Sequence, residues 1–199
     1  MDKQLIISIG REFGSGGHVI AEELAKIFQI QLYDGNLIDE VFEKDVTAED
    51  WRSSDEKPGT FAFSKVISGS KYSSEYMLAQ HQFDFLKKKA DEGESFVIVG
   101  RCSEHVLRGY EGLISIFVLG DEASKCERIQ RIYNYSEKKA KAELVRQDGL
   151  RKRYHNSFCD IRWGDSRGYD LCVNSSRLGI EGTVKLLEYY IREKRGLDK

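Results

Sequence analysis

The chain has 199 residues, a length typical of one domain with a substantial hydrophobic core. Its 31 basic and 33 acidic residues leave a net charge of −2, which does not indicate a general nucleic-acid-binding surface. No apolar run is long enough to cross a membrane, the first residues lack the layout of a signal peptide, and the four cysteines show no C-x-x-C or zinc spacing. We therefore expect a cytoplasmic protein with reduced thiols, no membrane or nucleic-acid partner, no metal ligands, and an oligomeric state that the sequence does not specify.

Short apolar runs alternate with helical periodicity along the whole chain. Buried strands are predicted at residues 5–9, 30–33, 96–99, 113–119 and 169–173. Helices are predicted at residues 19–28, 73–91, 102–108, 121–131 and 136–158, and along a C-terminal stretch with Ile180, Val184, Leu187 and Ile191 on one face. Continuous apolar strands separated by helices are typical of a parallel sheet covered on both faces. The predicted fold is therefore α/β, with a five-stranded parallel sheet.

A glycine-rich loop follows the first predicted strand and leads into an amphipathic helix. Gly14, Gly16 and Gly17 allow the backbone to approach an anion closely, and the N-terminus of a helix presents free N–H groups to it. The standard phosphate-loop pattern G-x-x-x-x-G-K-S/T is not met, because Gly17 stands where the lysine belongs and His18 where the hydroxyl belongs. We expect the amides of residues 14–18 to hold a phosphate; a tight turn without a ligand is the alternative.

Charged residues follow the ends of the predicted strands, where parallel sheets bind their ligands. Arg11 is a candidate substitute for the missing lysine, and an ordinary ion pair with Glu12 is the alternative. Arg101 is a candidate ligand for the phosphate of an acceptor, with a structural ion pair as the alternative. Asp34 is a candidate to orient the acceptor or a metal-bound water, or it opens a turn.

The charge is unevenly distributed along the chain. Residues 1–60 carry 6 basic against 13 acidic side chains, whereas residues 128–167 carry 11 basic against 5 acidic ones. Arginines are prominent in the basic block, which favours bidentate phosphate contacts over simple solvation. Arg131 and Arg151 are the candidates here, with salt bridges on a helix surface as the alternative reading.

Five segments together resemble the nucleoside monophosphate kinases, and most closely the cytidylate-kinase-like P-loop proteins. They are a variant phosphate loop, a second strand ending in Tyr-Asp, a strand ending in Gly-Arg, an arginine-bearing lid, and a closing strand with its turn, at residues 7–17, 32–34, 97–101, 128–154 and 169–180. The resemblance implies a single three-layer α/β/α P-loop domain over residues 1–199. It also implies a helical acceptor-binding insert at residues 35–92 and a helical lid at residues 128–160.

The resemblance further implies transfer of the γ-phosphoryl group of ATP, with Mg²⁺, to a nucleoside monophosphate such as cytidylate. With the residue patterns above, the candidates for catalysis are Arg11, Arg131 and Arg151. The candidates for binding ATP are Gly14, Ser15, Gly16, Gly17 and His18. The candidates for binding the acceptor are Asp34 and Arg101. Two other functions remain open. One is a nucleotide- or phosphate-binding module without turnover. The other is a kinase of a metabolite that is not a nucleotide.

Overall fold

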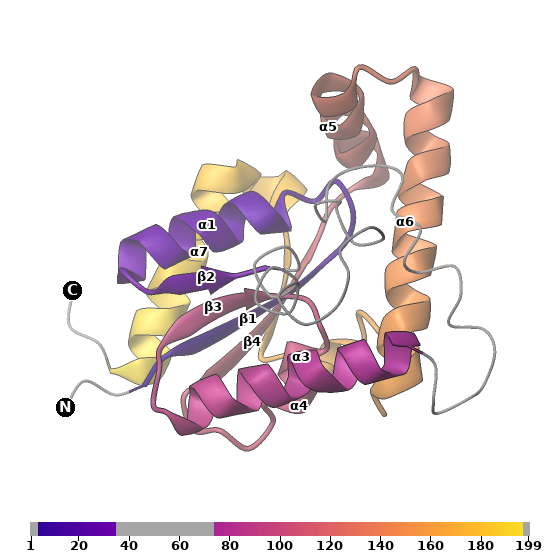
Figure 1. Ribbon diagram of the computed structural model, residues 1–199. Coiled ribbons are helices and arrows are strands. Elements are labelled where there is room, and N and C mark those ends of the chain that lie inside the picture. Colours follow the sequence, from indigo (N-terminus) through magenta and orange to yellow (C-terminus); the bar gives the residue numbers. More distant parts are fainter. Residues whose placement is uncertain (1–3, 35–73, 197–199) are drawn as a thin grey trace.

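The computed structural model describes residues 4–34 and 74–196, which contain one five-stranded sheet flanked by helices (Figure 1). Its strands are β1 (Ile6–Arg11), β2 (Gln31–Tyr33), β3 (Phe96–Val99), β4 (Leu113–Leu119) and β5 (Leu171–Asn174). They lie in the order β2-β3-β1-β4-β5, and every neighbouring pair is parallel. The predicted five-stranded parallel sheet is confirmed.

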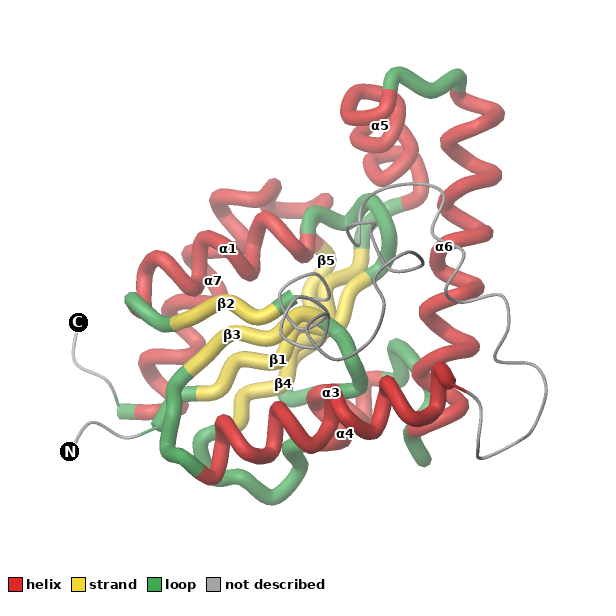
Figure 2. The backbone as a smooth tube through the Cα atoms, in the orientation of Figure 1, coloured by secondary structure: helices red, strands yellow, loops and turns green. Residues whose placement is uncertain are grey.

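The helices form a layer on each side of this sheet. They are α1 (Gly17–Phe28), α3 (Ser74–Asp91), α4 (Ser103–Val106), α5 (Glu122–Tyr133), α6 (Glu137–Phe158) and α7 (Ser175–Arg195), with a 3₁₀ turn at Ser166–Gly168. Helices α1 and α7 cover one face, and α3 and α4 cover the other (Figure 1). Helices α5 and α6 form a hairpin that extends beyond the carboxyl ends of the strands (Figure 2). The predicted three-layer α/β/α arrangement is therefore present.

Strand β1 is buried on both faces, as expected for a central parallel strand. Ile7 and Ile9 pack in the cluster formed with α1 and α7, whereas Ile6 packs in the cluster formed with α3 and α4. Ser8 also points to the second face, where its hydroxyl lies 2.7 Å from that of Ser103 on α4. This buried pair satisfies two polar groups that would otherwise destabilise the core.

The carboxyl ends of β1 and β3 form a topological switch point of the sheet. The chain leaves β1 for α1 on one face of the sheet, and it leaves β3 for α4 on the other face. Parallel α/β sheets bind their ligands at the edge where neighbouring strands are followed by helices on opposite faces. This switch point lies next to the glycine-rich loop, where the sequence predicts a ligand.

The N-termini of α5 and α6 are capped differently. Ser136 caps α6, because its hydroxyl accepts the Lys139 amide. Asp121 occupies the N-cap position of α5, but its side chain makes no cap hydrogen bond. Its Oδ1 instead accepts the Asn174 side-chain amide at 2.8 Å, so a tertiary contact has replaced the local one.

Other predictions fall partly on residues that the structure leaves undescribed. Residues 35–73, most of the predicted acceptor-binding insert, lie outside the described part of the chain. The remainder of that insert contains α3, in agreement with the predicted helix. Within the described ranges, no helix is both long and apolar enough to cross a membrane.

Candidate functional site

The loop between β1 and α1 has a backbone that only glycine accommodates at two positions. Gly14 and Gly16 both have φ of +79°, in the left-handed region. A Cβ on Gly14 would lie 3.1 Å from the Cγ1 atom of Ile129, and a Cβ on Gly16 would overlap the Ile180 side chain. Conformation and close packing therefore both require these glycines.

This loop presents unpaired N–H groups at the start of α1. Among residues 4–34 and 74–196, no acceptor is hydrogen-bonded to the amides of Gly14, Gly16 or His18. The Ser15 hydroxyl is used within the loop, where it donates to the Glu12 carbonyl at 2.8 Å. Free amides at a helix N-terminus suit an anion, whereas the Ser15 side chain is already occupied. Phosphate binding by these amides stays a prediction.

Arg11 crosses from this loop to the end of the neighbouring strand. Its side chain is buried, with only 9% of the residue exposed. A Cβ added to Gly17 would lie 2.6 Å from Arg11 Cβ, and a Cβ added to Gly100 would overlap Arg11 Nη1. The arginine therefore passes Gly17, which replaces the usual lysine, and its guanidinium reaches Gly100 beyond β3.

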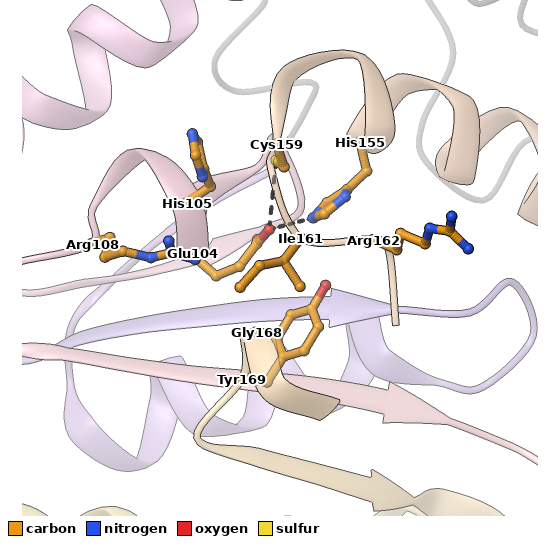
Figure 3. Close-up of a pocket in the computed structure, with 9 residues that line it drawn as sticks. All are labelled: Glu104, His105, Arg108, His155, Cys159, Ile161, Arg162, Gly168 and Tyr169. Atoms are coloured by element: carbon orange, nitrogen blue, oxygen red, sulfur yellow. Dashed lines mark hydrogen bonds and ion pairs between the residues drawn. The ribbon is translucent and has the colours of Figure 1, made fainter. Parts of the chain in front are cut away.

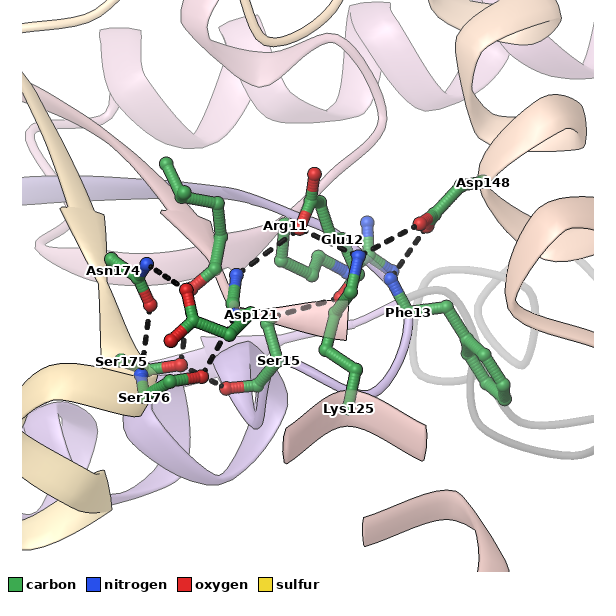
Figure 4. A network of polar contacts seen from close by, with 12 residues as sticks. Arg11, Glu12, Phe13, Ser15, Asp121, Lys125, Asp148, Asn174, Ser175 and Ser176 are labelled. Carbon is green, nitrogen blue, oxygen red and sulfur yellow. Dashed lines mark hydrogen bonds and ion pairs between the residues drawn. The ribbon is translucent and has the colours of Figure 1, made fainter. Parts of the chain in front are cut away.

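A network of charged groups ties the loop to the α5–α6 hairpin (Figure 4). The Glu12 carboxylate accepts from Lys125 Nζ at 2.8 Å and from the Gly120 amide at 3.1 Å. Asp148 on α6 accepts the Phe13 amide at 2.6 Å, and its other oxygen lies 3.5 Å from Lys125 Nζ. Burial raises the pKa of Asp148, against the opposing effects of the Phe13 amide and of Lys125. Sequence reasoning did not identify Lys125 or Phe13, because their partners come from other elements: Glu12 is 113 residues from Lys125, and Asp148 is 135 residues from Phe13.

An aromatic side chain fixes the position of the hairpin. Phe13, only 1% exposed, packs in a cluster with residues of α5 and α6 that includes Ile129 and Leu144. Arg151 on α6 lies over the Phe13 ring, with its Cζ 5.6 Å from the ring centroid. Its Nη1 donates to the Arg11 carbonyl at 3.2 Å. The structure therefore brings Arg151 to the phosphate loop, where it lines the same pocket as Gly14, Gly16, Gly17 and His18.

The two arginines of α5 occupy different places. The Arg128 guanidinium is close to the loop, with its Cζ 3.6 Å from the position of a Cβ on Gly16. Arg131 is exposed in the last turn of α5, and no hydrogen bond or ion pair of the described residues joins it to the loop. A catalytic role for Arg131 stays a prediction, and Arg128 is the arginine of this helix that the geometry places at the site.

The predicted acceptor residues lie at the same edge of the sheet. Asp34 follows β2, and its Oδ2 is 3.8 Å from the Nε2 of His18. Arg101 follows Gly100 and has φ of +57°, a left-handed conformation that costs a non-glycine residue about 1–2 kcal/mol. Burial raises the pKa of Tyr154 on α6, and the positive charge of Arg101 opposes that rise. Arg101 thus lies between the sheet edge and the lid helix.

Comparison with known proteins agrees with this arrangement. Residues 6–177 match the profile of the cytidylate kinase-like family. The chain belongs to this family. A solved structure of an uncharacterized protein from Eubacterium ventriosum has 37% sequence identity and a TM-score of 0.76, covering 94% of this chain and 98% of that one. The cytidylate kinase of Methanococcus aeolicus is 26% identical over 127 residues, which are 63% of this chain and 71% of that protein.

More distant structures share the fold of this family member. Shikimate kinase from Bacteroides thetaiotaomicron has a TM-score of 0.56 at 12% identity, covering 94% of this chain and 98% of that one. Shikimate kinase from Acinetobacter baumannii, solved with shikimate, has a TM-score of 0.52 at 10% identity and covers 96% of this chain and 95% of that one. At such low identity these similarities establish the P-loop kinase fold and leave the acceptor open.

Proposed function

We propose that this cytidylate kinase-like protein transfers the γ-phosphoryl group of ATP to a nucleoside monophosphate, with cytidylate as the first acceptor to test. The observation that carries the proposal is the course of Arg11, from Gly17 in the phosphate loop to Gly100 beside Arg101. A buried guanidinium on this course lies between the loop that would bind donor phosphates and the arginine that would bind the acceptor phosphate. Phosphoryl transfer requires positive charge in this position.

On the donor side, backbone and side chains have separate tasks. The free amides of Gly14, Gly16 and His18 would hold phosphate oxygens at the N-terminus of α1. Arg11 would take the place of the missing lysine, since a guanidinium stays charged and offers several donors. Arg151, which already contacts the Arg11 carbonyl, would add a second cation from the lid helix.

The described residues offer little protein coordination for Mg²⁺. When bound with the nucleotide, this ion would supply positive charge that neutralises the phosphates. The Ser15 hydroxyl is engaged with the Glu12 carbonyl, and the Glu12 carboxylate with Lys125. Asp34, 3.8 Å from His18, is the carboxylate that would hold the ion, directly or through water. Mg²⁺ commonly relies on phosphates and water in this way.

On the acceptor side, Arg101 would bind the phosphate of the nucleoside monophosphate. Arg131 and Arg151 belong to the α5–α6 hairpin, which in this proposal closes over both substrates and excludes water. Arg128 lies closer to the loop than Arg131 in the present geometry and would share this role. The hairpin is anchored to the loop through Phe13, so binding at the loop and closure of the hairpin would be mechanically linked.

A steady-state assay of ADP release with a panel of acceptors tests the proposal. The panel contains CMP, dCMP, UMP, AMP, GMP and shikimate, each with ATP and Mg²⁺. We expect turnover with a pyrimidine monophosphate, and loss of about 10²–10³-fold in kcat for Arg11→Ala, the loss typical of removing one preorganised donor. Arg146→Ala is the matched control, because Arg146 lies on α6 but pairs at the surface with Glu143. We expect this variant to retain full activity.

The alternatives give different results in the same experiment. ATP binding measured by calorimetry, without transfer to any acceptor, would identify a phosphate-binding module and refute the proposed reaction. Transfer to shikimate but to no nucleotide would identify a metabolite kinase. Undiminished turnover in Arg11→Ala would show that Arg11 does not substitute for the lysine.

A further inference from the structure

A buried group of metal-ligand side chains lies away from the phosphate loop, between α4 and the end of α6 (Figure 3). Glu104 Oε1 and His155 Nε2 are 2.6 Å apart, and Cys159 Sγ lies 4.0 Å from the same carboxylate oxygen. The three potential ligand atoms are all within 4.8 Å of one another. The side chains of Glu104 and His155 are only 6% and 8% exposed.

Two neighbouring elements hold these side chains. His155 and Cys159 are one helical turn apart, and the Cys159 amide still donates to the His155 carbonyl at 2.9 Å. Glu104 lies on α4, two residues after the buried Cys102, which packs in one cluster with Cys159. Cys102 is not one of the three residues whose ligand atoms lie within 4.8 Å of one another, so it packs beside the site.

We propose that Glu104, His155 and Cys159 bind a Zn²⁺ ion, with water as the fourth ligand. Bond lengths of about 2.0–2.3 Å place tetrahedral ligands roughly 3.3–3.8 Å apart. The Glu104–His155 contact would therefore widen by about 0.7 Å and the Cys159–Glu104 contact would shorten by a few tenths of an ångström. These shifts are small for side chains that already converge on one point.

The charges of the cluster and its surroundings are compatible with this ion. One thiolate, one carboxylate and a neutral imidazole balance the charge of Zn²⁺. Arg108 and Arg162 line the same pocket as the three ligands. Zinc binding requires the Cys159 thiol to lose its proton, so that metal uptake releases protons to solvent.

The proposed ion would connect two parts of the candidate active site. Helix α4 begins two residues after Arg101, and α6 carries Asp148 and Arg151 before it ends at the cluster. A zinc clip here would fix the base of the lid helix to the turn that presents Arg101. The inference uses none of the residues proposed to bind ATP, and it stands or falls separately from the kinase activity.

Metal content and cobalt spectroscopy of the full chain test this site. The protein is purified without a metal-binding tag, stripped with a chelator, and titrated with Zn²⁺ and separately with Co²⁺. We expect one tightly bound equivalent, a thiolate-to-cobalt charge-transfer band, and a rise in Tm of roughly 5–10 °C when free Zn²⁺ exceeds its Kd about 100-fold. Cys102→Ser should leave that band unchanged, since the single thiolate of the site comes from Cys159.

Matched variants separate this site from adventitious binding. Cys159→Ser and Glu104→Gln should each abolish tight binding, whereas Cys172→Ser removes a half-buried thiol on β5 and should leave it intact. Circular dichroism of each metal-free variant verifies that it is folded. Absence of a tight equivalent in the wild-type protein, or its survival in folded Cys159→Ser, would overturn the proposal and leave a buried Glu104–His155 ion pair. Loss of the cobalt band in folded Cys102→Ser would overturn the three-ligand assignment.

Discussion

Substitution of Gly17 by alanine tests how Arg11 packs in the phosphate loop. The added Cβ would lie 2.6 Å from Arg11 Cβ and 3.1 Å from its Cγ, whereas carbon atoms in contact are normally about 3.5–4.0 Å apart. Arg11 Cβ is attached to the central strand and cannot rotate away, so the loop or the strand must shift. Overpacking of this kind costs about 1–3 kcal/mol. At about 2–4 °C per kcal/mol for a chain of this size, we expect a clear fall in Tm.

A second glycine provides the matched control for this measurement. Gly149 lies inside α6, and a Cβ there would meet no atom within 4 Å. Gly149→Ala makes the same chemical change but should stabilise the protein by up to about 1 kcal/mol, because alanine favours the helix. Thermal and urea unfolding of both variants give the two free-energy changes. A Gly17→Ala protein as stable as Gly149→Ala would refute the packing of Arg11 described above.

Gly17→Lys extends the same test to function. It restores the residue of the standard phosphate loop but introduces the same overlap with Arg11. We therefore expect weaker ATP binding in calorimetry and no gain in turnover. Improved affinity or a higher kcat would show that the space beside Gly17 accepts a side chain and that Arg11 does not occupy the place of the lysine.

Two further predictions concern groups that hold the sheet together. Asp170 accepts from the Ser115 amide and hydroxyl and from Lys194. Burial alone would raise its pKa, but the bonds from Lys194 and Ser115 outweigh burial and lower it. The stabilisation by Asp170 is therefore present at neutral pH and is lost as the pH falls below 3.8, the ordinary pKa of an aspartate. In Asp170→Asn, the free energy of unfolding should depend less on pH in the acid range. An unchanged dependence on pH would contradict this. For the buried hydroxyl pair, Ser103→Ala should lower the free energy of unfolding by about 1–3 kcal/mol, because it leaves the Ser8 hydroxyl unpaired. The double variant Ser8→Ala/Ser103→Ala should lose less stability in urea unfolding. If the losses of the two single variants add up in the double variant, the two hydroxyls are not coupled.

The sheet and its helices were predictable because buried elements have a local pattern of apolar residues in the sequence. Residues 96–99 form an uninterrupted apolar run, and the strand that this run predicts, β3, is buried at every position. The glycine loop was predictable for a related reason, since its position between a strand and an amphipathic helix is visible in sequence order. The observed bounds of two elements differ from the predicted ones where residues that are not apolar continue the element. Strand β1 extends to Arg11, and helix α1 begins at Gly17.

The side-chain arrangement of the site was less accessible from sequence. Arg128 and Arg131 are three residues apart on one helix, and which of them faces the loop depends on how α5 is rotated against Phe13 and α6. Periodicity does not encode that rotation for a charged face. The same holds for Lys125, whose partners Glu12 and Asp148 come from other elements. These contacts exist only after the hairpin has packed on the loop.

The departure of this loop from the standard pattern and the placement of Arg11 are two aspects of one feature. A lysine on the first turn of the helix and an arginine at the end of the strand would compete for the same space, because Arg11 passes directly beside residue 17. A loop that carries its cation on residue 11 therefore requires glycine at position 17. It also requires glycine at position 100, where the guanidinium ends and where φ of +76° independently excludes most side chains. Gly17 alone indicates a lost phosphate ligand. Together with Gly100 and the buried Arg11, it supports the proposal that the cation of this loop stands on the strand instead of the helix.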